Sequence, residues 1–196
     1  MHHSSLLIAA LWPDGHGNIG YGANVGSNHT GRAPDQELLV GEGCFFGLSC
    51  CVKFPADLRD AAGSIIATGV VVPQGRIRYP LSLIQSDPAG PPRIKPGWVF
   101  SANAYALARN QQKYLKRGGT PVPLVSLAVL QSVAVALDVL EQGDPASFAG
   151  GCALDRDDIR RGVEAYRALL RYGVAEHGTR FPGSALTAAL AAGLAD

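Results

Sequence analysis

A six-residue spacing of apolar side chains constrains the first half of this chain more than any other feature. Apolar residues or proline recur every six positions in three runs: Leu7, Pro13, Ile19 and Val25; Val40, Phe46 and Val52; and Ile66 and Val72. Glycine directly follows four of these anchors, at Gly20, Gly26, Gly41 and Gly47. Each unit of six predicts a short strand with its anchor pointing inward, followed by a corner that a small residue permits.

Three such units make one triangular coil, and stacked coils form a parallel β-helix. We therefore predict a fold that is mainly β with α, in which a β-helix of about four coils precedes a helical C-terminal region. An ordinary all-β sandwich is the alternative. It would explain the frequent glycines, but it does not explain a constant spacing of six.

The repeat is interrupted twice. Val25 and Val40 are 15 residues apart, and Val52 and Ile66 are 14 apart, where multiples of six are expected. With three anchors per coil, Leu7, Val25 and Val52 stack on one face, so we expect a loop to leave after that face in two successive coils. Both loops are rich in polar residues, and loops on a rigid scaffold often carry sites.

The second half of the chain has a different composition. After Gly97 it is rich in Ala and Leu, and it predicts four helical segments: Ser101–Arg117, Val122–Leu140, a segment opened by the capping pair Asp155 and Asp158, and a last one from Ser184. We expect a β-helix domain at residues 1–84, a Pro/Gly-rich linker at 85–97 and a helical region at 98–196.

Composition excludes several classes of partner. Of the 196 residues, 17 are Lys or Arg and 16 are Asp or Glu, a balance that provides no basic surface for nucleic acid or an anionic membrane. The most apolar run, residues 121–137, contains prolines and is short for a bilayer, so it predicts a buried helix. No signal peptide is evident, and we expect a cytoplasmic protein whose four cysteines are buried apolar side chains.

Particular segments resemble known proteins. Residues 64–77, SIIATGVVVPQGRI, are similar to the last coil of the left-handed β-helix (hexapeptide-repeat) transferases, which include acyl- and acetyltransferases. Residues 20–37, GYGANVGSNHTGRAPDQE, and residues 45–48, FFGL, more closely resemble an uncharacterised bacterial family of longer β-helix proteins. The resemblance to the superfamily covers residues 4–84 and implies that the predicted parallel β-helix is left-handed.

The resemblance implies a homotrimer with a coenzyme A thioester, such as acetyl-CoA, in the groove between neighbouring β-helices. A loop histidine would act as general base on a small-molecule acceptor, and that role carries over to His29. Either Asp35 or Glu37 would orient the histidine. A sugar or sugar-nucleotide-like acceptor would contact Asn28, Arg32 and Lys53, and the phosphates of the coenzyme would contact Arg76 and Arg78.

The sequence also departs from the transferase pattern. Ala67 stands where the last coil usually has glycine, and residues 78–83, RYPLSL, replace the usual Gly-x-Pro-Ala stretch near the coenzyme. The alternative function is therefore a non-catalytic trimeric scaffold or binding module, in which Asn28, His29 and Thr30 only satisfy the backbone of their own loop. Carbonic anhydrases of this fold bind zinc through histidines that include a pair separated by four residues. The chain has no such pair, so we predict no metal site.

Overall fold

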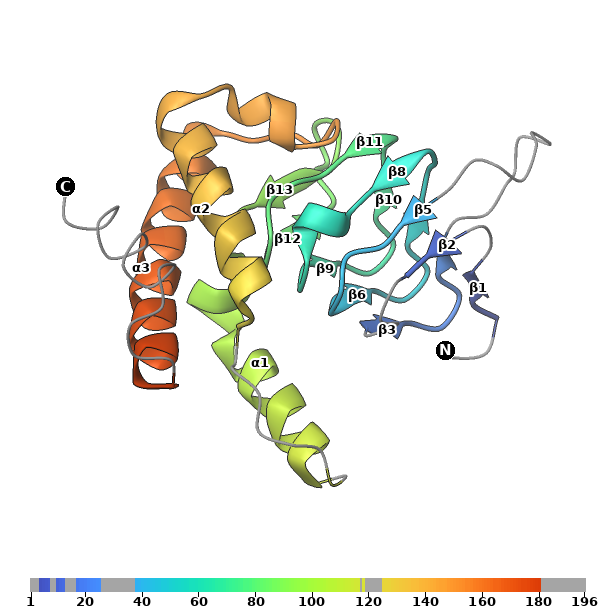
Figure 1. The fold of residues 1–196 in the computed structure, drawn as a ribbon. Helices are drawn as coiled ribbons and strands as arrows, with labels where there is room; N and C mark the ends of the chain where they lie inside the picture. The colour runs from blue at the N-terminus through green and yellow to red at the C-terminus, as the bar shows by residue number, and fades with distance from the viewer. Residues whose placement is uncertain are drawn as a thin grey trace.

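The computed structural model describes residues 4–7, 10–12, 17–25, 38–116, 118 and 125–180. In these ranges the chain is a mixed α/β protein, in which short strands of three sheets are followed by three α-helices (Figure 1). No helix in the described ranges combines the length and the apolar character needed to cross a lipid bilayer.

Successive strands contribute to three sheets in turn. Sheet A contains β1 (Leu6–Leu7), β4 (Asn24–Val25), β7 (Cys51–Val52) and β10 (Val71–Val72). Sheet B contains β2 (Ala10–Leu11), β5 (Leu38–Leu39), β8 (Ala56–Asp57) and β11 (Gly75–Arg76). Sheet C contains β3 (Gly17–Ile19), β6 (Cys44–Phe46), β9 (Ile65–Ile66), β12 (Leu83–Gln85) and β13 (Arg93–Lys95).

The pairing between strands is parallel, with the exception of the antiparallel pair β12 and β13. This order is compatible with the predicted β-helix. It differs from a sandwich, whose sheets are built from antiparallel neighbours.

The spacing of six correctly predicts the core. Seven anchors belong to one hydrophobic cluster and are at most 3% exposed: Ile19, Val25, Val40, Phe46, Val52, Ile66 and Val72. Leu7, Val25, Val52 and Val72 are register partners in sheet A, so the predicted stacking of the first three is confirmed.

The second interruption of the repeat lies one corner later than predicted. After Val52 the chain continues into β8, which pairs with β5, and Leu58 is buried six residues after Val52. The extra residues form a short 3-10 helix, η1 (Arg59–Ala61), between β8 and β9. The expectation that this loop leaves after sheet A was therefore wrong, because burial of Leu58 keeps the repeat in register for one more unit. The first interruption, residues 26–37, lies outside the described residues.

Two helices begin at other residues than predicted. Helix α1 (Trp98–Lys116) starts three residues before Ser101, and the Ser101 hydroxyl donates to the carbonyls of Gly97 and Trp98 instead of capping the helix. Helix α2 (Leu127–Gln142) starts later than Val122, because the Oγ of Ser126 accepts a hydrogen bond from the Val129 amide and caps it.

Helix α3 (Arg156–Arg180) begins as predicted. The Oδ1 atom of Asp155 accepts a hydrogen bond of 2.7 Å from the amide of Asp158, so the capping role of Asp155 is confirmed. The segment predicted from Ser184 lies outside the described residues.

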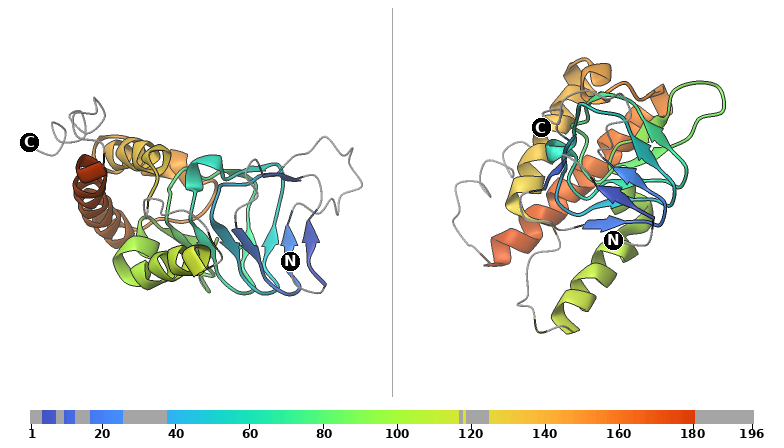
Figure 2. Two further views of the ribbon diagram at one scale, coloured as in Figure 1. Left: turned by 60° about the horizontal axis from the view of Figure 1, so that its bottom comes forward. Right: turned by 90° about the vertical axis from the view of Figure 1, so that its right-hand side faces the viewer.

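The helices pack against the last strands of the stack, at the end opposite β1 (Figure 2). The range 85–97, expected to be a linker, contains β13, which pairs with β12 and contacts α3. The Tyr166 hydroxyl of α3 donates to the Pro80 carbonyl at 2.8 Å. Between α2 and α3, the short helix η2 (Pro145–Phe148) reaches back to sheet B through an antiparallel bridge between Ile77 and Ala149.

Candidate functional site

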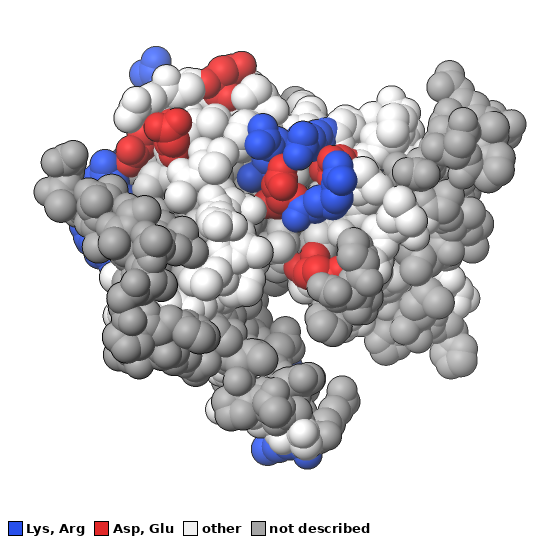
Figure 3. All heavy atoms as spheres, viewed as in Figure 1, with Lys and Arg blue, Asp and Glu red and all other residues white. Residues whose placement is uncertain are grey.

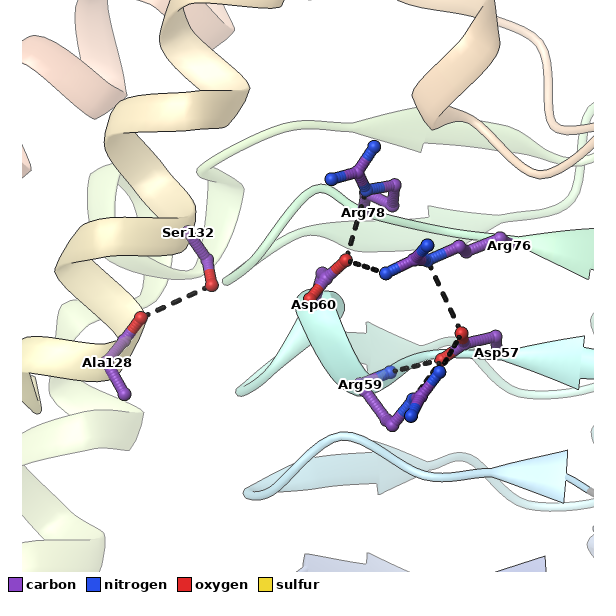
Figure 4. Close-up of polar contacts among 7 residues, drawn as sticks. All are labelled: Asp57, Arg59, Asp60, Arg76, Arg78, Ala128 and Ser132. Carbon is purple, nitrogen blue, oxygen red and sulfur yellow. Dashed lines mark hydrogen bonds and ion pairs between the residues drawn. The ribbon is translucent and has the colours of Figure 1, made fainter.

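A cluster of arginines and aspartates lies on the outer surface of sheet B and the adjoining η1 (Figure 3). Asp57 of β8 and Arg76 of β11 are register partners, and Arg76 Nε lies 3.3 Å from Asp57 Oδ2. Arg59 holds the same carboxylate with both Nε and Nη2, at 3.1 and 2.9 Å. Arg76 Nη2 also reaches Asp60 Oδ2 at 2.7 Å, so the two carboxylates are joined through Arg76 (Figure 4).

Arg78 completes the cluster on the side nearest the helices. Its Nε donates to Asp60 Oδ2 at 3.0 Å, and its Cζ lies 4.0 Å from the centroid of the Phe148 ring. The backbone amide of Arg78 also donates to the Phe148 carbonyl at 2.9 Å. The Phe148 ring on one face of the guanidinium and Asp60 at its Nε edge therefore fix the plane of the guanidinium.

The terminal nitrogens of Arg78 remain available. Within the described residues they form no hydrogen bond, and Figure 4 shows them directed away from Asp60. A guanidinium in this arrangement offers two parallel N–H groups, the geometry that binds carboxylate or phosphate oxygens in a bidentate manner.

A cavity of about 170 Å³ opens beside Arg78, between sheet B and α2. It is lined by Asp60, Arg78, Gln131, Ser132, Val135 and Phe148. The Ser132 hydroxyl donates to the Ala128 carbonyl at 3.2 Å, which leaves its lone pairs to accept from a ligand (Figure 4). The cavity therefore combines a charged donor, an amide and two acceptors.

The cluster has a net positive charge. It contains three arginines and two aspartates, a formal charge of +1. Partial burial alone would raise the pKa of Asp57, but the hydrogen bonds and charge of Arg59 together with the charge of Arg76 outweigh burial and lower this pKa. Arg59 and Arg76 each use a terminal nitrogen to hold a carboxylate, whereas Arg78 uses only its Nε, so Arg78 is the member best placed to bind an added anion.

The predicted site residues have different outcomes. Arg76 and Arg78, predicted to contact the coenzyme, do lie together. Lys53 is exposed at the corner between β7 and β8, where its backbone amide donates to the Val72 carbonyl at 3.0 Å; within the described residues its side chain forms no hydrogen bond or ion pair. Five predicted residues lie outside the described residues, so their predicted roles stay predictions: Asn28, His29, Arg32, Asp35 and Glu37.

Sequence reasoning missed the carboxylates and the helix residues of this site. Asp57 and Arg76 are nineteen positions apart, close to the eighteen of one coil, and this spacing is a signal that could have paired them. Ser132 and Phe148 carry no comparable signal, because tertiary packing of α2 and η2 alone brings them to the cavity.

The cysteines and the metal-ligating side chains provide no reactive centre in the described residues. Cys44, Cys50 and Cys152 are buried, as expected, and burial raises the pKa of each thiol to about 12. Cys51 is only half-buried. In the described ranges no three His, Cys, Asp or Glu side chains are grouped so that they could hold a metal ion.

Comparison with known proteins identifies an uncharacterised bacterial relative. No family model matches the chain, and no solved structure matches it. An uncharacterized protein of Treponema pallidum (strain Nichols) is 31% identical in an alignment of 169 residues that covers 81% of this chain and 23% of that protein. The chain is thus similar over most of its length to an uncharacterised bacterial protein, and it spans about a quarter of that relative.

Proposed function

We propose that the chain is a ligand-binding module built on a left-handed β-helix of the hexapeptide-repeat type. Three features support this fold: strands that join three sheets in turn, parallel pairing, and buried anchors six residues apart. The proposed ligand is an anionic, hydroxyl-bearing small molecule held in the cavity beside Arg78. The observation that carries the proposal is the fixed guanidinium of Arg78, a residue that lines that cavity and whose terminal nitrogens form no hydrogen bond within the described residues.

The lining of the cavity selects the class of ligand. Arg78 and the amide of Gln131 supply donors for one carboxylate or phosphate group, whereas Asp60 and Ser132 supply acceptors for hydroxyl groups. An acidic monosaccharide or a sugar phosphate has both kinds of group. A purely anionic ligand would leave the acceptors unpaired, which costs free energy in a partly closed site.

The size of the cavity limits how much of a ligand it encloses. Its volume of about 170 Å³ is below the roughly 300–1,000 Å³ of pockets that enclose drug-sized molecules. A cavity of about 170 Å³ suits a sugar-sized group better than a whole coenzyme A molecule. The proposal therefore assigns Arg78 to the sugar-like ligand and not to the coenzyme.

Titration calorimetry tests this proposal. The ligands are glucuronate and glucose 6-phosphate, with uncharged glucose as the control ligand. We expect the two anions to bind and glucose to bind far more weakly. Arg78→Gln should weaken binding by about tenfold or more, because it removes a charge-assisted hydrogen bond of about 1.5–3 kcal/mol. Arg78→Lys should restore only part of the affinity, since an ammonium cannot bind an acid group in a bidentate manner.

The matched control is Arg171→Gln, which removes the same charge from an exposed position of α3 outside the cavity. This variant should bind both anions like the unmodified protein. Equal loss of affinity in Arg171→Gln and Arg78→Gln would show that binding follows the net charge, and would contradict a site at Arg78.

A second candidate function is acyl transfer from a coenzyme A thioester to the same class of acceptor. It is favoured by the parallel strands that join three sheets in turn and by the resemblance of residues 64–77 to the last coil of hexapeptide-repeat transferases; His29 itself lies outside the described residues. In this reaction His29 takes the proton of an acceptor hydroxyl, the oxygen attacks the thioester carbonyl, and the coenzyme leaves as its thiol. Asp35 or Glu37 orients the imidazole.

Release of thiol from acetyl-CoA, measured with amino sugars and sugar nucleotides as acceptors, separates the two functions. If the chain is a transferase, His29→Ala should lower the rate by about 10²–10⁴ while circular dichroism stays unchanged. A pure binding module shows no turnover with any acceptor, and its affinity for glucuronate is unaffected by His29→Ala.

A further inference from the structure

The charged residues are unevenly distributed along the chain. Residues 98–137 contain four of the 17 basic residues and none of the 16 acidic ones, so the rest of the chain has 13 basic against 16 acidic residues, a net charge of −3. The four basic residues are Arg109, Lys113, Lys116 and Arg117, all in α1 or directly after it. The near-neutral total, from which we expected no basic surface, hides this concentration of positive charge.

The second half of α1 projects from the body of the protein. Leu107 is half-buried and packs against the hydrophobic core. Beyond it the helix extends away from the sheets and from α3, as Figure 1 and the right-hand view of Figure 2 show. Four residues of this part are exposed and lie on one face of the helix, because their spacings are 4, 3 and 4: Tyr105, Arg109, Gln112 and Lys116. We call these four residues the α1 stripe.

The cations of the α1 stripe are not neutralised by the described protein. Arginines elsewhere are paired with carboxylates, namely Arg59, Arg76, Arg78, Arg93, Arg160, Arg161 and Arg167. No described carboxylate lies within ion-pair distance of Arg109 or Lys116. The helix dipole favours a cation in the last turn, which accounts for Lys116 but not for Arg109 in the middle of the helix. Unpaired cations grouped on one face are typical of a surface that binds a polyanion.

We propose that the α1 stripe binds single-stranded nucleic acid. Arg109 and Lys116 are about 10 Å apart along the helix axis, so they contact separate phosphates of one strand. Tyr105 is 75% exposed, and its ring stacks on a base. The amide of Gln112 lies between the two cations on the same face and donates to and accepts from a base edge.

The composition of the stripe favours this partner over other anionic partners. A lipid bilayer requires an aliphatic face that enters the headgroup region, and the stripe has no aliphatic residue. In a duplex the bases already stack on one another, whereas a single strand offers free base faces to the ring of Tyr105. An acidic peptide pairs with the cations but has no base to stack on that ring. The net negative charge of the rest of the chain confines a polyanion to α1.

This site is separate from the cavity beside Arg78. That cavity lies between sheet B and α2, and no residue of α1 lines it. Arg78→Gln should therefore bind an oligonucleotide like the unmodified protein. Failure of the sugar-acid proposal would leave the nucleic-acid proposal intact, and the reverse also holds.

Fluorescence anisotropy with labelled oligo(dT) and oligo(U) of about twenty nucleotides tests the proposal. Two to four phosphate contacts predict that the logarithm of the binding constant falls with the logarithm of the salt concentration with a slope of about −1.4 to −2.8. Arg109→Gln should weaken binding several-fold and reduce this slope by about 0.7. Arg156→Gln removes the same charge from an exposed position at the start of α3 and should change neither quantity. Equal losses in both variants, or no binding at low salt, would overturn the proposal.

Tyr105→Ala separates nucleic acid from other polyanions. It should raise the dissociation constant for the oligonucleotides at least about fivefold and leave the salt slope unchanged, because stacking involves no counterion. Binding of inorganic polyphosphate, which has no bases, should be unaffected by the same variant. Tyr21→Ala, at a tyrosine outside α1 that is 54% exposed, is the matched control and should bind normally. Unchanged oligonucleotide binding by Tyr105→Ala, or binding to phosphatidylserine vesicles without binding to oligonucleotides, would contradict the proposal.

Discussion

The Arg78 guanidinium lies over the ring of Phe148, with its Cζ 4.0 Å from the ring centroid. Phe148 belongs to η2 and Arg78 follows β11, so this contact joins the sheets to the helical part of the chain. It also makes the orientation of the ligand-binding group depend on a residue seventy positions away in the sequence.

We predict that Phe148→Leu weakens ligand binding without removing a charge. Leucine keeps most of the apolar contact but loses the attraction between cation and ring, which is worth about 0.5–2 kcal/mol. Affinity for glucuronate should fall several-fold, less than in Arg78→Gln. Calorimetry on both single variants and the double variant measures the coupling, and strictly additive losses would show that Phe148 does not act through Arg78.

The buried anchors predict a large effect of core truncation. Phe46 is completely buried among the other anchors, so Phe46→Ala should lower the free energy of unfolding by about 3–5 kcal/mol. Chemical denaturation monitored by circular dichroism checks this. Tyr105→Ala, at an exposed position of α1, should change stability by no more than about 0.5 kcal/mol and serves as the control. Equal effects would contradict a close-packed interior.

Stability should fall in acid through Asp57. Its pKa is lower in the fold than in the unfolded chain, where Asp titrates near 3.9, because Arg59 and Arg76 stabilise the carboxylate against the opposing effect of partial burial. Its contribution is therefore fully present above about pH 4 and is lost as the pH falls through the folded pKa. Unfolding curves from pH 7 to pH 2 should show this loss, and Asp57→Asn should flatten it. An unchanged acid limb in the variant would exclude Asp57 as a source.

The N-cap of α3 makes a separate prediction. Asp155→Ala removes the acceptor of the Asp158 amide and should cost about 0.5–2 kcal/mol of stability. Asp155→Asn keeps a capping oxygen and removes the charge that pairs with Arg93 at 2.6 Å. Because both side chains of that ion pair remain partly exposed, at 33% and 44%, the pair contributes little, and Asp155→Asn should cost less than Asp155→Ala in thermal and chemical unfolding. The reverse order would assign the effect to the ion pair instead of the cap.

The residues explain which parts of the fold were predictable. A spacing of six identifies the buried anchors, because each coil repeats the same inward position, and Asp155 marks the start of α3 by its own hydrogen bond. The position of η1 was missed, because the spacing between Val52 and Ile66 does not say at which corner the extra residues leave. The start of α1 at Trp98 depends on the left-handed backbone of Gly97, which packs against Tyr166 of α3.

The candidate site was predictable only in part. Arg76 and Arg78 were identified because basic residues near the last coil suggest an anion. Asp57 and Asp60 form ion pairs with these arginines, and the terminal nitrogens of Arg78 are left for a ligand. Ser132, Gln131 and Phe148 come from the helical half, and no local pattern of that half indicates which residues will face sheet B.

A crystal structure of the protein grown with glucuronate tests the central claim most directly. The account predicts electron density in the cavity between sheet B and α2, with the ligand carboxylate against the terminal nitrogens of Arg78 and its hydroxyl groups toward Asp60 and Ser132. The same crystals grown from Arg78→Gln protein should lack that density. An empty cavity with ligand bound elsewhere, for example beside Arg160 and Arg161, would contradict the account.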